Sequence, residues 1–206
     1  ASGNSSSGFG IKKEIAPNLE KIEDPSRVEE FGRQIENGIN VLRSISPPKT
    51  FKPLKDFAID KSSDTFGSIA FNSYKKFGNN APIISIENPP AGSGLSRAED
   101  LRAVIEASRK KFVEKAKLDG MSEHEAKKQA EKLIGATWDV GHINMIRKFG
   151  YGEKELIGET KTIAPYVKHV HLSDNFGLEH TELPMGMGNV PTKEHLKLLD
   201  KYNKQA

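Results

Sequence analysis

Two short stretches decide the fold: GATWDVGHINM at residues 135–145 and VKHVHLSDN at residues 167–175. Both read as strands with β-branched residues, and both end in polar side chains. A third stretch of this type, APIISIE at residues 81–87, precedes them and is stopped by Asn-Pro-Pro. The sequence therefore predicts three strands, each with polar residues at its carboxyl end.

Helical patterns surround and separate these strands. Apolar residues recur at spacings of three and four, and a Ser-x-x-Glu sequence at Ser122 has the spacing of a capping box. Strands that alternate with helices pack as parallel βαβ units, so we expect an α/β fold. The helices are expected at residues 17–46, 65–77 after a cap at Asp64, 97–117, 122–133, 153–165 and 192–202.

We expect a single domain over residues 1–206, because neither a fixed-period repeat nor a clear linker divides it. Residues 1–10 are rich in serine and glycine and are expected to be flexible. Residues 11–80 are expected to be mostly helical, and residues 81–206 to form the βα units that carry the site.

The composition narrows the chemistry. The chain has 31 basic and 28 acidic residues, and its formal net charge of +3 permits a phosphorylated ligand. This near balance does not give the dense cationic surface that nucleic-acid binding needs. There are no cysteines, so a metal would be held by His, Asp or Glu. No apolar run approaches the roughly 20 residues of a membrane span, and the first residues are not a secretory signal. We therefore expect a soluble, cytoplasmic protein without a membrane partner.

Residues able to bind metal stand where the strands end: Glu87, Asp139, His171 and Asp174. The carboxyl ends of parallel strands open on one mouth, where active sites usually lie. A single acid there is most often a helix cap, and a single strand histidine is most often a hydrogen-bonded core group. Three successive strands that all end in such residues instead indicate a divalent-metal site. Oxygen and imidazole ligands without thiolate suit Mn, Mg, Co or Zn.

Further polar residues extend this set. His142 follows Asp139 in an Asp-x-x-His motif, which is also typical of a turn with a capping aspartate. His180 and Glu182 lie beyond the last strand, either in a plain polar loop or at a second metal position or substrate contact, for which Asp174 is also a candidate. The backbone amides of the following Gly-Met-Gly sequence are candidates to receive an oxyanion.

Three other side chains, those of His124, His195 and Trp138, could belong to a site but have simpler explanations. His124 and His195 lie in helical patterns and are expected on the surface. Trp138 fits either the core or the wall of a ligand site, and its spacing does not separate the two.

Four segments resemble the xylose-isomerase-like barrels, which include sugar isomerases and epimerases and have the apurinic endonucleases as relatives. The segments are ISIENP, WDVGHIN, VKHVHLSDN and HTELPMGMGNVP, and the resemblance covers about residues 80–200. It implies a TIM barrel with a metal centre of a Glu, an Asp, a His and a final Glu, of which the first three match Glu87, Asp139 and His171. His142 matches a position that contacts substrate in the epimerases and binds a further metal in the endonucleases, while His180 and Glu182 fall where the endonucleases carry an Asp-x-His pair.

The chain departs from that family at both ends. No strand after residue 175 brings the final Glu, and the sequence before Glu87 is too short for three clear strands and has no histidine. A whole barrel takes about 250 residues. We therefore expect an incomplete barrel, roughly its second half, or a barrel that a partner chain completes.

The resemblance implies a metal-dependent isomerase or epimerase acting on a sugar or sugar phosphate by proton transfer through an enediolate. Glu87 would move the proton and His142 would orient a substrate oxygen. The alternatives are an apurinic-endonuclease-like phosphodiesterase and a non-catalytic barrel fragment. We expect a small-molecule partner rather than nucleic acid, leave homo-oligomerisation open, and expect these 206 residues alone to be inactive.

Overall fold

The computed structural model describes residues 27–44 and 51–203. Backbone contacts group the chain into two units, Ala1–Phe51 and Lys52–Ala206, where we expected a single domain. In the first unit the described residues form helix α2, Val28–Ser44. The helix expected at residues 17–46 is confirmed over this span. Its two ends, and the flexible segment expected at residues 1–10, lie outside the described residues.

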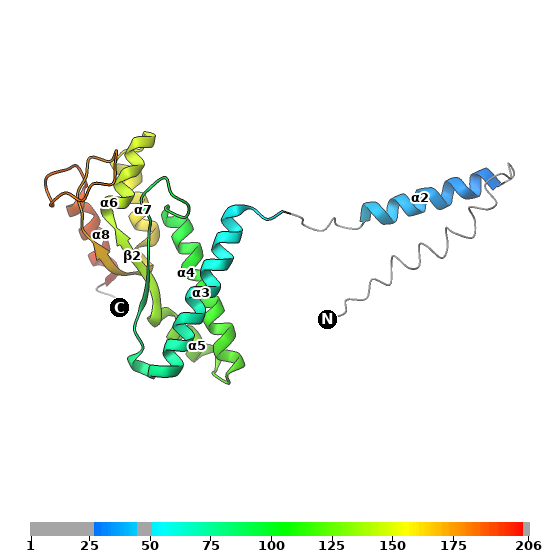
Figure 1. Ribbon diagram of the computed structural model, residues 1–206, viewed down its shortest axis with the longest axis horizontal. Helices are drawn as coiled ribbons and strands as arrows, with labels where there is room; N and C mark the ends of the chain where they lie inside the picture. The colour runs from blue at the N-terminus through cyan, green and yellow to red at the C-terminus, as the bar shows by residue number, and fades with distance from the viewer. Residues whose placement is uncertain (1–26, 45–50, 204–206) are drawn as a thin grey trace. The chain divides into compact units, whose positions relative to one another are not determined.

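The second unit contains three parallel strands in the order β1–β2–β3 (Figure 1). Their bounds are Ile84–Glu87, Ile134–Asp139 and Val167–His171. The α/β class and the parallel strands are thus confirmed. Three strands do not close a barrel, and the described part of the chain adds no other strand to this sheet, so the barrel stays a proposal.

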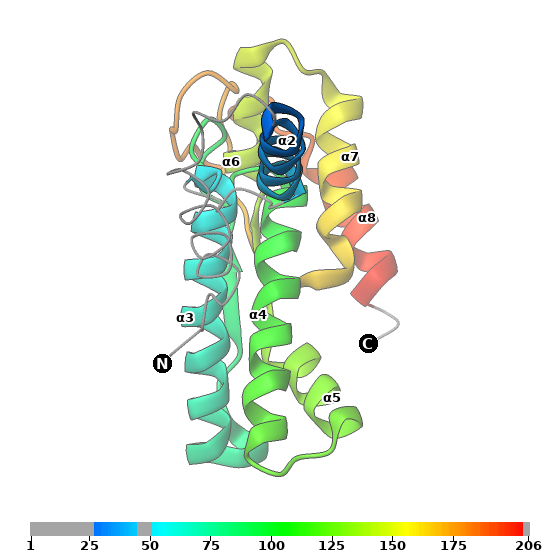
Figure 2. The same cartoon turned by 90° about the vertical axis from the view of Figure 1, so that its right-hand side faces the viewer.

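A layer of helices lies against one face of the sheet. Figure 2 shows α3, α4, α7 and α8 side by side in that layer. No helix in the described part of the chain is both long and apolar enough to cross a lipid bilayer. The helical bounds are α3 Leu54–Phe77, α4 Ala98–Leu118, α5 Glu123–Leu133, α6 Val140–Asn144, α7 Glu153–Ile163 and α8 Thr192–Asn203, with short 3-10 turns at η3 Gly78–Asn80, η4 Met145–Phe149 and η5 Ala164–Tyr166.

Helix α3 begins earlier than its sequence predicts. We expected a cap at Asp64, but the helix starts at Leu54 and runs through the Ser-Ser-Asp-Thr segment without a break. Its buried face packs against α4 so closely that a Cβ on Gly67 would lie 2.7 Å from the Ser108 carbonyl oxygen. This contact holds the middle of α3 against α4.

Strand side chains alternate between two environments. Apolar residues of one face are buried against the helices, and the Trp138 indole N–H donates to the Thr160 hydroxyl of α7 at 2.9 Å. Trp138 is therefore a core residue. The opposite face is polar, and the strand register sets Glu87 beside Thr137 and Asp139 beside His171. The polar face thus carries the predicted ligands at its carboxyl end.

Candidate metal centre

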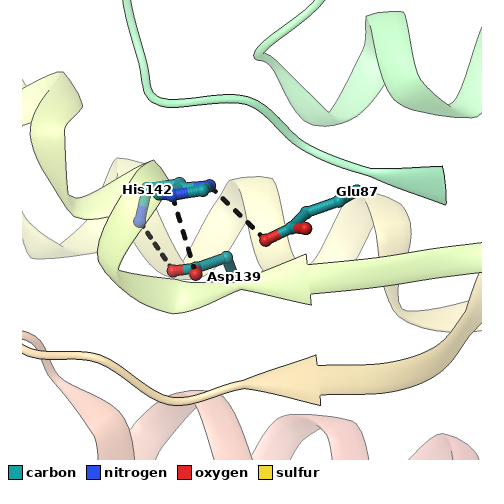
Figure 3. Close-up of side chains that lie close together, drawn as sticks. All are labelled: Glu87, Asp139 and His142. Atoms are coloured by element: carbon teal, nitrogen blue, oxygen red, sulfur yellow. Dashed lines mark hydrogen bonds and ion pairs between the residues drawn. The ribbon is translucent and has the colours of Figure 1, made fainter. Parts of the chain in front are cut away.

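Three side chains meet at the carboxyl edge of the sheet: Glu87 at the end of β1, Asp139 at the end of β2, and His142 in α6, which directly follows β2 (Figure 3). Each offers one ligand atom, and these atoms lie within 4.8 Å of one another. His142 Nδ1 is 3.8 Å from Glu87 Oε1, and His142 Nε2 is 3.7 Å from Asp139 Oδ2. Two carboxylates and an imidazole at this spacing could hold one divalent ion.

The Asp-x-x-His spacing is set by a helix cap. Asp139 is the N-cap of α6, and its Oδ1 accepts a hydrogen bond from the His142 backbone N–H at 2.9 Å. The same oxygen accepts a longer bond of 3.4 Å from the Ser173 hydroxyl. The cap therefore ties one ligand residue to the other. Asp139 Oδ2 is turned to the imidazoles and remains available to a cation.

His142 has a defined tautomer. Its Nδ1 lies 2.7 Å from the Asn88 backbone carbonyl oxygen, which can only accept, so Nδ1 carries the proton. The other nitrogen, Nε2, then keeps its lone pair in the neutral ring. It lies 2.8 Å from His180 Nε2, so the proton of that contact belongs to His180. Buried His142 thus presents a lone pair of the kind that binds metal.

His171, a predicted ligand, borders the same group. Its Nδ1 lies 2.8 Å from Glu87 Oε1 and 3.9 Å from Asp139 Oδ2. The structure therefore brings together all three residues of the predicted metal set. His171 and Glu87 are half exposed, whereas Asp139 is buried, so the centre opens on the side of the first two.

The loop after β3 adds the other candidates. His180 contacts His142, and His180 Nε2 lies 3.8 Å from Glu182 Oε1, with both side chains exposed. The loop is held by an antiparallel bridge between Asp174 and Leu183, in which each backbone N–H donates to the other residue's carbonyl oxygen. His180 therefore belongs to the group, and Glu182 stands at its rim.

Asp174 has a different environment. Its buried carboxylate accepts four backbone N–H groups, from Asn175, Gly186, Gly188 and Val190, at 2.8 to 3.0 Å. Burial raises the pKa of this carboxyl, but the four hydrogen bonds outweigh it, and the net pKa is lowered. The amides of the Gly-Met-Gly sequence, which we considered for an oxyanion, hold Asp174 instead. Asp174 thus organises the loop that carries His180.

Two residues were missed or misplaced from the sequence. His195 was expected on the surface, but it is fully buried, and its Nδ1 lies 2.7 Å from the Thr160 hydroxyl. Its four-residue spacing from buried Leu199 could have revealed this. Asn88 was considered only as the first residue of the Asn-Pro-Pro sequence that ends the strand, although its buried side chain contacts the backbone of Asp139. Its position directly after Glu87 was the available signal.

The comparisons with known proteins add no relative: no family model, curated protein or solved structure matches this chain. The chemistry of the centre therefore has to be argued from its own donor set. Carboxylate oxygens and imidazole nitrogens fit Mn, Mg, Co and Zn, and the chain offers no thiolate to select a softer ion.

Proposed function

We propose that this chain carries the metal centre of a sugar or sugar phosphate isomerase or epimerase. The observation that carries the proposal is the convergence of Glu87, Asp139 and His142 within 4.8 Å at the carboxyl ends of neighbouring parallel strands. In barrel enzymes this edge is where chemistry is performed. We propose as its fold an incomplete barrel of the xylose-isomerase-like type, because parallel strands with helices on one face (Figure 2) are the unit that such a barrel repeats.

An isomerase moves a proton between adjacent carbon atoms, and an epimerase removes a proton from one carbon atom and returns one to its opposite face. A bound divalent ion would polarise the substrate carbonyl and favour an enediolate. Glu87 is the proton-transferring group, because its carboxylate is half exposed and can be reached by a ligand. The His171 contact to Oε1 holds that carboxylate in one orientation. His142, whose Nε2 lone pair would bind the ion, would orient a substrate oxygen through that ion.

Metal binding is the first test. The full chain is titrated with Mn²⁺ and Zn²⁺ by calorimetry, and we expect one tight site that Asp139→Ala abolishes. Glu114→Gln, which changes an exposed carboxylate on α4, serves as the matched control and keeps full affinity. A chain that binds neither ion would contradict the proposal and would favour the alternative of a non-catalytic barrel fragment.

Activity is the second test. This chain and any longer form from the same reading frame are screened with aldoses, ketoses and their phosphates, with metal present. An active form should lose turnover with Glu87→Gln while its unfolding curve is unchanged. Turnover that persists in Glu87→Gln would refute the role of this carboxylate.

One observation favours a second candidate, a metal-dependent phosphodiesterase. The Nε2 atoms of His142 and His180 lie 2.8 Å apart, and Asp139 Oδ2 lies 3.7 Å from His142 Nε2. If Glu87, Asp139 and His171 held a first ion, His142 and His180 would be left to hold a second one, with Asp139 shared. Two-metal sites are typical of phosphodiester cleavage. Stoichiometry separates the candidates: one ion per chain favours the isomerase. Two ions, with one lost in His180→Ala, favour the phosphodiesterase.

A further inference from the structure

Asn88 joins the ends of β1 and β2 through its side chain. The residue is fully buried, and it follows the last paired residue of β1, Glu87. Its Nδ2 donates to the Asp139 carbonyl oxygen at 3.1 Å, and its Oδ1 accepts from the Asp139 N–H at 2.8 Å. The side-chain amide therefore replaces, for one further residue, the backbone pairing that the two strands no longer make.

The backbone of the same segment holds His142. The Asn88 carbonyl oxygen accepts from His142 Nδ1 at 2.7 Å, and the Ala91 N–H donates to the His142 carbonyl oxygen at 3.1 Å. The ring and the main chain of His142 are thus both held by the segment that follows β1. A backbone carbonyl behind an imidazole selects its tautomer and turns the other nitrogen to the metal in known metal centres.

We propose that Asn88 is a positioning residue of the metal centre. It acts through Asp139 and His142: the side-chain amide ties the Asn88 backbone to the Asp139 backbone, and this tie holds the Asn88 carbonyl oxygen against His142 Nδ1. This inference rests on the proposed metal centre and identifies what preorganises it. Asn88 itself contributes no ligand, because its donor and acceptor atoms are occupied by Asp139.

The two hydrogen bonds between the side chain at position 88 and the Asp139 backbone require an asparagine. The Asp139 backbone needs one donor and one acceptor at fixed spacing, which a short side-chain amide supplies. A leucine has nearly the same shape, but it leaves both backbone groups of Asp139 without the partners that they have in Asn88. A glutamine has the right groups on a side chain that is one methylene too long for the buried space.

The test compares Asn88→Leu and Asn88→Ala with the wild-type full chain. Long-range proton–nitrogen NMR of the metal-free chain at about pH 8, where imidazoles are neutral, reports which nitrogen of His142 carries the proton. His142→Asn assigns the signal. We expect the Nδ1–H tautomer in the wild type. In both variants we expect a mixture of tautomers, because the Asn88 backbone is no longer tied to Asp139 and its carbonyl oxygen can move away from His142 Nδ1. Calorimetry with Mn²⁺ and Zn²⁺ should show an affinity about 10- to 100-fold weaker in both variants.

A purely structural role would weaken folding without these effects. Thr160→Val is the matched control, because it removes buried hydrogen bonds of Trp138 and His195 away from the centre. This control should unfold more easily yet keep the wild-type affinity and tautomer. Folded Asn88 variants that keep both the Nδ1–H tautomer and the affinity would overturn the proposal. A wild-type chain that binds no ion contradicts the proposed function, whereas the tautomer measurement still decides the role of Asn88.

Discussion

The buried histidine of α8 makes a quantitative prediction about stability and pH. His195 is fully buried, and its Nδ1 contacts the Thr160 hydroxyl. Within residues 27–44 and 51–203, its Nε2 has no hydrogen-bond partner. Burial lowers the pKa of its imidazole from 6.5 to about 4, while neighbouring Glu194 raises it and Arg147 lowers it. In the folded chain His195 is therefore neutral at pH values where the unfolded chain is already protonated.

The sign follows from proton binding. Between pH 6.5 and about 4 the unfolded state binds more protons at His195 than the folded state, so stability is complete above pH 6.5 and falls as the pH falls. A pKa difference between 6.5 and about 4, at about 1.4 kcal/mol for each pH unit, amounts to about 3 kcal/mol. Below about pH 4 this contribution no longer changes.

The assay is denaturant unfolding followed by the fluorescence of the single tryptophan, Trp138, whose indole N–H donates to the same Thr160 hydroxyl. The free energy of unfolding is measured from pH 7 to pH 4 for the wild type and for His195→Gln, which cannot be protonated. The difference between the two should shift by about 3 kcal/mol over this range. His124→Gln, at an exposed histidine of α5, should run parallel to the wild type. A His195→Gln curve that is also parallel would refute the reasoning.

Three further variants test the loop and the core. Asp174→Asn should lower the free energy of unfolding by about 2 kcal/mol at pH 7, because four backbone donors lose a charged acceptor. The difference from the wild type should fade as the pH falls through the lowered pKa of Asp174 in the folded chain. An unchanged denaturation midpoint at pH 7 would contradict this prediction. Gly188→Ala puts a Cβ 2.4 Å from the Asp174 carboxylate, so limited proteolysis should cut the loop faster than in the wild type; equal cleavage would argue against the contact. Phe112→Ala leaves a cavity between α3 and α4 and should lower the free energy of unfolding, measured in urea, by about 3–5 kcal/mol. A decrease below about 1 kcal/mol would be inconsistent with the burial of Phe112.

The strands and the ends of most helices could be predicted from the sequence because their signals are local. Ser122 caps α5 through a hydrogen bond from the Glu125 N–H, as its spacing indicated. Glu87, Asp139 and His171 were placed at one edge because parallel strands share a direction, and the structure brings them together. The hydrophobic periodicity, the helix caps and the shared direction of the strands are therefore sufficient to place these three side chains at one edge of the sheet. The barrel and the bound metal remain proposals.

The sequence by itself thus determined which residues stand at the strand ends, and the tertiary structure decided what each of them does. Asp174 looked equivalent to Asp139, yet backbone amides up to 16 residues away occupy its oxygens. The tautomer of His142 depends on a carbonyl 54 residues earlier in the chain, and the buried state of His195 depends on Thr160 of another helix. A side chain's protonation and partners are set by the atoms that packing brings around it, and those atoms come from distant segments that no local pattern specifies.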